Sequence, residues 1–261
     1  MAGGTPGTSA CRPVREKDDD VGTASTGDAA KAPAHSQTLS RGIRALEILA
    51  DAQAPMTITE LSAALGVHRS IAYRILRTLE DHSLLMRDDS GRVQAGPGLA
   101  ALARGVSRDL QTAALPELTQ LANELAMTAF IAVWDHRDSV TLLTVEPRHS
   151  GATLAQRPGT RHSFSSGAPG IAIQSAISEE AWARLAPGLP YRPEARAAKL
   201  AGYATSHDEV LPGVSAIAAP IHNPHGTPAA ICVVFLGPSA DPDSIGARLA
   251  ASARTVEAQL Q

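Results

Sequence analysis

The stretch HRSIAYRILRTLED, residues 68–81, combines an apolar helix face with a cationic one. At about 100° per residue, one side of a helical wheel carries Ile71, Ala72, Ile75, Leu76 and Leu79. The opposite side carries Arg69, Ser70, Tyr73, Arg74 and Arg77. No acidic residue occurs between positions 61 and 79. A solvent-exposed helix face usually carries both acidic and basic side chains, which form i,i+4 ion pairs. The uniformly basic face of this stretch therefore indicates another role.

The residues around this stretch predict a small helical unit with a hairpin. In TITELSAALG, residues 57–66, Thr57 and Glu60 match the capping-box pattern, and Gly66 stands where a left-handed residue ends a helix. An earlier helix is expected in SRGIRALEILADA, with Ser40 as its N-cap and with Ile43, Leu46 and Leu49 at helical spacing. LLMRDDSGRVQA, residues 84–95, predicts two short strands around a turn.

A capped helix, a turn of about three residues and a basic helix form the pattern of a helix-turn-helix, and the hairpin suits the wing of a winged variant. Arg69, Ser70, Tyr73 and Arg74 are expected to enter the major groove, and Arg77 to contact a phosphate. The alternative is a three-helix bundle with a solvated basic face. The pattern favours DNA binding.

Further contacts to DNA are expected outside the basic helix. The start of the preceding helix, with Thr57 and Thr59, could hold a phosphate on its free N–H groups. Arg87 and Arg92 of the hairpin could reach the DNA backbone or the minor groove. His68 stands near the helix start, where a weak cap and a phosphate donor are both open to it.

The whole chain has 261 residues and a formal net charge of −3, which by itself argues mildly against a nucleic-acid partner. A local patch can outweigh that average. Of its two cysteines, Cys11 lies in a polar segment and Cys232 in an apolar run, so a disulfide framework is not expected and Cys232 is interpreted as a buried hydrophobe. No apolar run is long enough for a membrane helix, and we expect a soluble cytoplasmic protein.

Composition and pattern divide the chain into four parts. Residues 1–36 hold almost no large apolar residue and are predicted to be a disordered tail. Residues 37–98 form the helical unit with its hairpin, and residues 99–115 are expected to be a linker helix. Residues 116–261 alternate strands and helices, with a hairpin in VSAIAAPIHNPHGTPAAICVVFLG and a final helix over roughly 242–260. This predicts an α+β fold with a largely antiparallel sheet.

Three segments resemble the isocitrate lyase regulator (IclR) family of bacterial transcription regulators. They are SRGIRALEILADAQAPMTITELSAALGVHRSIAYRILRTLEDHSLL, GTRHSFSSGAPGIAI and GYATSHDEVLPGVSAIAAPIHNPHGTPAAICVVFLGP. The resemblance runs from about residue 38 to the C-terminus. It implies a winged helix-turn-helix domain, a linker helix and a GAF-like or profilin-like effector-binding domain. It also implies dimers or tetramers on palindromic or repeated operators, and repression as the commoner mode.

The resemblance also implies where a small-molecule effector binds. The pocket loop corresponds to Ser165, Ser166 and Gly167, and the polar position after G-Y-A corresponds to Ser206. Three further positions, often polar in the family, hold Ala216, Val233 and Phe235. A small carboxylate needs several convergent donors, so we expect an effector larger or more apolar than a two- or three-carbon acid, such as an aromatic compound with one polar end.

Two other classes of function compete with this reading. No G-x-S-x-G or P-loop motif occurs, so neither an enzyme nor a cofactor is expected. His222 and His225 of HNPH are interpreted as turn residues and not as metal ligands. The remaining alternative is a ligand-binding sensory module that acts through protein partners without specific DNA binding.

Overall fold

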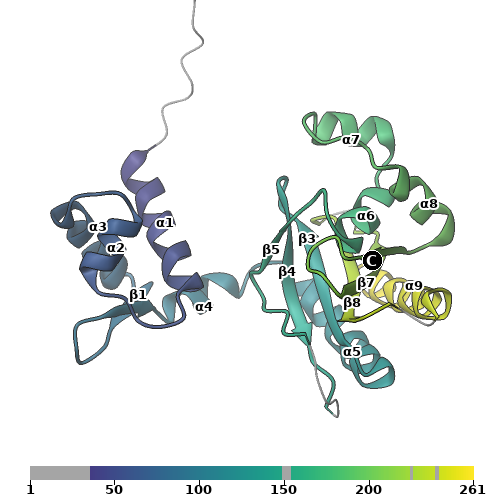
Figure 1. The fold of residues 1–261 in the computed structure, drawn as a ribbon, viewed down its shortest axis with the longest axis horizontal. Coiled ribbons are helices and arrows are strands. Elements are labelled where there is room, and N and C mark those ends of the chain that lie inside the picture. Colours follow the sequence, from purple (N-terminus) through teal and green to yellow (C-terminus); the bar gives the residue numbers. More distant parts are fainter. Residues whose placement is uncertain (1–35, 149–153, 224–225, 239–240) are drawn as a thin grey trace, which may run out of the picture. The chain divides into compact units, whose positions relative to one another are not determined.

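A computed structural model describes residues 36–148, 154–223, 226–238 and 241–261. The chain forms two compact units, one ending at Gly98 and the other beginning at Leu99 (Figure 1). The predicted tail, residues 1–36, lies outside the described residues except for Ser36. The observed α+β architecture is the predicted one.

The first unit consists of three helices and a two-stranded antiparallel hairpin. Its elements are α1 (Gln37–Asp51), α2 (Ile58–Ala64), α3 (Arg69–Asp81), β1 (Leu85–Arg87) and β2 (Val93–Ala95). Apolar side chains from all three helices and the hairpin meet in one core, whose buried members are Ala45, Leu49, Leu61, Ile75, Leu76, Leu79, Leu85 and Val93. The helix-turn-helix and its hairpin were therefore correctly predicted.

Helix α1 begins earlier than its pattern suggests. Ser36, not Ser40, is the N-cap, and its side chain accepts a hydrogen bond from the Leu39 backbone N–H. Ile43, expected in the core, is 50% exposed. The buried face instead carries Ala45 and Leu49, which are four residues apart, whereas Ile43 lies about 200° from Ala45 around the helix. The core face of α1 thus includes a small residue, Ala45. The spacing of the large apolar residues alone did not predict it.

The second unit is built on a six-stranded sheet in which every neighbouring pair is antiparallel. In spatial order its strands are β5 (Arg161–Ser163), β4 (Asp138–Val145), β3 (Thr128–Trp134), β8 (Ala229–Leu236), β7 (Val214–Ile221) and β6 (Ala204–His207). Strands β7 and β8 are the two strands of the predicted hairpin. The short edge strands β5 and β6 were not predicted, because three or four residues are too few for a visible alternation.

Helices cover both faces of this sheet. One face packs against α5 (Arg108–Leu125) and α9 (Pro242–Gln259), and the other against α6 (Ala168–Ser175), α7 (Glu179–Leu185) and α8 (Pro193–Ala201) (Figure 1). Successive residues of a strand point to opposite faces. In β3, Ile131 accordingly joins the core under α5 and α9, whereas Phe130 joins the core on the other face.

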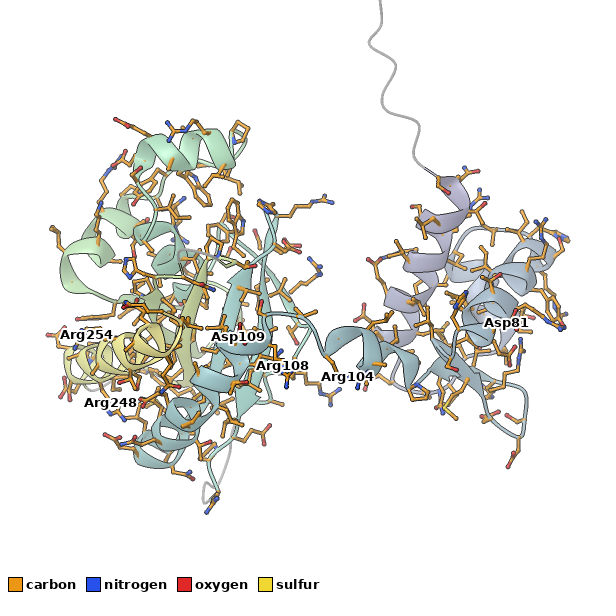
Figure 2. The ribbon with its side chains drawn as sticks, turned by 180° about the vertical axis from the view of Figure 1, so that it is seen from behind. Asp81, Arg104, Arg108, Asp109, Arg248 and Arg254 are labelled. Atoms are coloured by element: carbon orange, nitrogen blue, oxygen red, sulfur yellow. The ribbon has the colours of Figure 1, made fainter. Side chains whose placement is uncertain are left out.

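The connection between the units differs from the single helix expected over 99–115. The structure has a short helix α4 (Gly98–Ala103), a turn, and then α5, which continues past Pro116. Ser107 adopts a left-handed conformation at φ 45°, which separates the two helices. Leu110, Ala113 and Ala114 are buried in the core of the second unit. Arg104 and Arg108 flank the turn (Figure 2).

Among the described residues, no helix is both long enough and apolar enough to cross a membrane.

Candidate DNA interface and ligand pocket

Helix α3 has the two faces that its sequence predicts. Ala72, Ile75, Leu76 and Leu79 are buried in the core of the first unit. The opposite face leaves Arg69, Ser70, Tyr73, Arg74 and Arg77 exposed. The side chains of Arg69, Arg74 and Arg77 form no hydrogen bond or ion pair with any other described residue. The helix therefore presents unpaired guanidinium groups to solvent.

The start of α3 is capped by His68. Its Nδ1 accepts hydrogen bonds from the Ser70 backbone N–H at 3.3 Å and from the Ser70 hydroxyl at 2.8 Å. Since Nδ1 is the acceptor, the proton of the neutral ring is on Nε2. The cap interpretation of His68 therefore holds in this structure, and Nε2–H remains available as a donor.

Arg87 of the hairpin, unlike the three α3 arginines, has an ion-pair partner. Its Nε donates to both carboxylate oxygens of Glu80, at 3.0 and 3.2 Å. Its guanidinium also lies 5.9 Å from the centre of the Tyr73 ring. Arg87 therefore braces the hairpin against α3, and its charge is already compensated by Glu80.

The N–H groups at the start of α2, which were expected to bind a phosphate, are partly used by a capping box within the helix. Thr57 accepts a hydrogen bond from the Glu60 backbone N–H, while its own backbone N–H donates to the Glu60 carboxylate at 2.7 Å. The hydrogen bond from that N–H holds the pKa of Glu60 below its ordinary value. Arg92 lies 3.6 Å from the same carboxylate and donates to the Pro55 carbonyl. A phosphate on Thr57 would meet this negative charge, whereas Thr59 is exposed.

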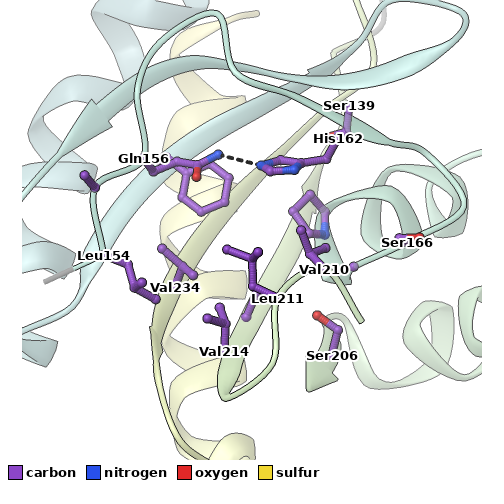
Figure 3. Close-up of a pocket in the computed structure, with 15 residues that line it drawn as sticks. Ser139, Leu154, Gln156, His162, Ser166, Ser206, Val210, Leu211, Val214 and Val234 are labelled. Atoms are coloured by element: carbon purple, nitrogen blue, oxygen red, sulfur yellow. Dashed lines mark hydrogen bonds between the residues drawn. The ribbon is translucent and has the colours of Figure 1, made fainter. Parts of the chain in front are cut away.

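The second unit contains a pocket between the sheet and the start of α6 (Figure 3). Its volume is about 90 Å³, well above the roughly 10–15 Å³ that a cavity needs to hold one water. Most of the wall is apolar, formed by Phe130, Leu154, Ala155, Pro169, Val210, Leu211, Val214, Ala216 and Val234. The remaining lining residues are Ser139, Gln156, His162, Ser166, Gly167 and Ser206.

The start of α6 is held by two side chains that come from far along the chain. Ser206 Oγ accepts from the Ala168 backbone N–H at 2.9 Å, and Glu209 Oε2 accepts from the Gly167 N–H at 2.9 Å. Gly167 has a φ of 85°, which L side chains rarely adopt. Ser206 and Gly167 thus meet at the start of α6, although they are far apart in the sequence.

The expected pocket residues divide into two groups. Ser166, Gly167, Ser206 and Ala216 do line the pocket. Ser165 does not: it is exposed, and its hydroxyl lies 2.8 Å from that of Ser163.

The assignment of Val233 and Phe235 to the pocket is corrected by the structure. Both residues pack on the opposite face of the sheet, in the core under α5 and α9, and Val234 lines the pocket instead. A shift of one residue along a strand exchanges the two faces. Strand β8 is apolar throughout, so its sequence gives no sign of which residues face the pocket.

The polar side chains at the far end of the pocket were not predicted from the sequence. Gln156 donates from Nε2 to Thr141 Oγ1 at 2.6 Å, and the same nitrogen lies 3.2 Å from His162 Nε2. An amide nitrogen cannot accept, so His162 Nε2 is the acceptor. Burial lowers the pKa of His162, which favours the neutral ring. The pairing of β4 with the short strand β5 places His162 beside β4, and Gln156 reaches both strands from the loop before β5. No motif signals this arrangement.

A loop between β6 and β7, residues 208–213, lies over the pocket. Val210 and Leu211 line the pocket from this loop, although they are 41% and 54% exposed. Glu209 ties the loop down through the Gly167 N–H and through Arg192 Nη2, at 3.2 Å. Arg192 also donates to the Ser165 carbonyl at 2.9 Å.

The polar residues of the pocket lining are serines, Gln156 and His162. No Lys, Arg, Asp or Glu is among the described residues that line it. Within the described ranges, no group of three or more His, Cys, Asp or Glu side chains is placed to hold a metal ion. Burial raises the pKa of the Cys232 thiol far above its usual value. His225 of HNPH lies outside the described residues.

Comparison with known proteins relates both units to transcription regulators. Residues 38–89 match the IclR helix-turn-helix domain. The HTH-type transcriptional regulator XynR of Escherichia coli (strain K12) is 24% identical over 204 residues, covering 72% of this chain and 81% of XynR.

Solved structures show the same fold over both units. The IclR transcriptional regulator from Alicyclobacillus acidocaldarius is 26% identical, with a TM-score of 0.73 over 87% of this chain and 100% of that one. An IclR homologue from Microbacterium hydrocarbonoxydans, crystallised with 4-hydroxybenzoate, is 21% identical, with a TM-score of 0.74 over 85% of this chain and 98% of that one. The chain thus resembles IclR-type DNA-binding transcriptional regulators, through a matched IclR helix-turn-helix domain at residues 38–89 and through the same fold over both units.

Proposed function

We propose that this regulator is a repressor without enzymatic activity, whose affinity for its operator changes when a small metabolite binds in the pocket of the second unit. The observation that carries the DNA part is the face of α3, where three arginines are exposed and unpaired among the described residues. Phosphates and guanine edges are the partners that such a face fits.

The residues of α3 take different roles in this proposal. Arg69, Ser70, Tyr73 and Arg74 lie in its first half and read base edges, and Arg77, one turn farther along, contacts a phosphate. Thr59 and the Nε2–H of His68 supply further backbone contacts. Arg87 and Arg92 position the hairpin, because their charges are engaged by Glu80 and Glu60.

The effector proposed for the pocket is larger or more apolar than a two- or three-carbon acid. The pocket walls are mostly apolar and no cation lines them among the described residues, so a small carboxylate would lack a counter-charge. An IclR homologue crystallised with 4-hydroxybenzoate supports an aromatic effector. Titrating glyoxylate and pyruvate by calorimetry tests this, and micromolar binding of either compound would contradict it.

The active species is proposed to be a dimer, or a dimer of dimers, on a palindromic or repeated operator. One winged unit reads a short half-site, and symmetry provides the second. Leu39 and Ile43 of α1 support this, since they are exposed apolar side chains that a second copy would cover. Residues 98–108 are proposed to transmit the effector signal by a shift between two arrangements of the dimer.

The test of DNA binding is a mobility shift of the DNA beside its own gene, at several salt concentrations. We expect a complex that weakens steeply as salt rises, because cations condensed on the phosphates are released on binding. An absence of any shift, with ligand binding retained, would favour a sensory module that acts through protein partners.

A further inference from the structure

A carboxylate lies on the same side of α3 as two of the proposed DNA contacts. Tyr73, Arg77 and Glu80 are spaced by four and by three residues, so they form one stripe along the helix. Helical side chains lean toward the N-terminus, so Glu80 extends over the turn that contains Arg77. Oppositely charged residues three apart on a helix can form an ion pair. Glu80 could therefore bind the arginine that is proposed to contact a phosphate.

In the structure this carboxylate is bound by Arg87 of β1 instead. Arg87 Nε donates to Glu80 Oε1 at 3.0 Å and to Glu80 Oε2 at 3.2 Å. The Arg87 guanidinium also lies 5.9 Å from the centre of the Tyr73 ring. The Arg87 side chain is only 24% exposed, although its group is charged. Arg87 is thus held against α3 by two residues, and both carboxylate oxygens of Glu80 have a partner.

Arg77 remains unpaired beside this ion pair. It is exposed, and its guanidinium forms no hydrogen bond or ion pair with any other described residue. Arg77, Glu80 and Arg87 together carry a formal charge of plus one, whereas Arg77 and Glu80 alone would carry none. The ion pair with Arg87 therefore preserves a local positive charge on the exposed face of α3.

We propose that Arg87 is a positioning residue of the DNA interface, which binds the Glu80 carboxylate and thereby keeps Arg77 free to contact a phosphate. Arg87 itself contacts no DNA, because its charge is compensated by Glu80 and its guanidinium lies against Tyr73. This inference rests on the proposed function only in taking the exposed face of α3 as the DNA interface.

Two simpler roles of Arg87 lead to different expectations. If Arg87 contacted a phosphate directly, the contact would be lost whenever Arg87 is replaced, whatever residue stands at position 80. If the ion pair only braced the hairpin, replacing either partner would weaken DNA binding equally. Under the proposal only the loss of Arg87 is harmful, because it leaves Glu80 free to pair with Arg77.

The experiment measures the affinity of the full chain for operator DNA between about 50 and 200 mM salt, by fluorescence anisotropy. The slope of log affinity against log salt concentration reports the number of phosphate contacts. Arg87→Met should bind more weakly, with a slope reduced by about one for each bound copy. Glu80→Gln should bind at least as tightly as the parent. The double variant with both changes should regain the slope of the parent.

Asp81→Asn in the Arg87→Met background is the matched control. Asp81 follows Glu80 at the end of α3 (Figure 2), is exposed, and forms no ion pair with Arg87. Asp81→Asn changes the net charge as Glu80→Gln does, so a general electrostatic effect would restore binding equally in both. We expect no recovery from Asp81→Asn.

Arg77→Ala provides the second check, as part of a double-mutant cycle. Arg77→Ala alone should lower the salt slope by about one for each bound copy, as the loss of one phosphate contact. In the Arg77→Ala background, Arg87→Met should lower the slope no further, because the cation that Glu80 would capture is absent. Additive losses would instead indicate two independent contacts.

Several results would overturn the inference. They are parental binding of Arg87→Met, no recovery in the double variant, equal recovery with Asp81→Asn, and additive losses with Arg77→Ala. Weak binding of Glu80→Gln would also contradict it, and this variant remains informative if Arg87→Met fails to fold. Failure of the proposed function looks different, because Arg74→Ala and Arg77→Ala would then both leave DNA binding unchanged.

Discussion

Arg74 and Arg87 show that an arginine in a basic region need not be a DNA contact. Arg74 is exposed and unpaired within the described residues, whereas Arg87 is paired with Glu80 and stacked over Tyr73. The sequence separates Arg87 from Glu80 by seven residues, so no helical spacing reveals the pair. The two arginines differ in solvent exposure and in their ion-pair partners. The difference arises because the hairpin folds back onto α3 and brings Arg87 to Glu80.

His162 is predicted to titrate below its ordinary pKa of 6.5, because burial disfavours the imidazolium. As the pH falls, His162 is therefore protonated in the unfolded chain at a higher pH than in the folded chain. The stability contributed by neutral His162 is complete above the unfolded pKa and is lost as the pH falls through the folded one. NMR titration of its Cε1–H should give a midpoint below 6.5. A midpoint at or above that value would contradict the burial of the ring.

The elements of the first unit were predictable because their signals are local. Thr57 and Glu60 form the capping box that their spacing indicates, and Gly66 adopts a φ of 64°. The α1 N-cap was missed because both Ser36 and Ser40 are suitable residues, and the register of the buried face decides between them. Capping residues limit the positions at which a helix can begin, and packing of its buried face selects one of those positions.

Thr57→Ala is predicted to destabilise the first unit by about 1 kcal/mol, since it removes a helix cap. Thr59→Ala is the control, because Thr59 is exposed in the first turn of the same helix and its side chain makes no hydrogen bond with a described residue. Chemical denaturation followed by far-UV circular dichroism measures both variants. If the two had equal midpoints, the capping box would not contribute to stability.

The pocket was only partly predictable. Ser166, Gly167 and Ser206 lie in distinctive loops, which a family resemblance carries over well. The strand residues were not predictable, because β8 is apolar on both faces and a shift of one position exchanges Val233 and Val234. Gln156 lies in the loop before β5, where it contacts both His162 of β5 and Thr141 of β4, and a single sequence does not reveal these contacts.

The loop over the pocket is predicted to depend on Glu209. Glu209→Ala removes the acceptor for the Gly167 N–H, and exchange of that amide with solvent should become about tenfold faster. Glu194→Ala is the matched control, since Glu194 pairs with Arg192 Nε but not with Gly167. Amide hydrogen exchange of the segment around Gly167 measures this. Equal protection in both variants would mean that Glu209 does not hold the loop.

The exposed basic face of α3 and the pocket lie in different units of the molecule. The unpaired arginines of α3 belong to the first unit and the pocket belongs entirely to the second, each with its own core. A ligand can alter DNA affinity only if it binds two arrangements of the assembly unequally. The effect must therefore pass through residues 98–108 or through contacts between copies of the chain.

The most direct measurement of the central claim is the affinity of Arg74→Ala for operator DNA and for a scrambled duplex, by fluorescence anisotropy. Arg254→Ala is the control, because Arg254 is also exposed but lies on α9 of the second unit (Figure 2). We predict that Arg74→Ala loses about 1–3 kcal/mol of operator binding and most of the preference over scrambled DNA, while Arg254→Ala behaves as the parent. An Arg74→Ala variant that retains the parent's full preference for the operator would contradict the assignment of α3 to the major groove.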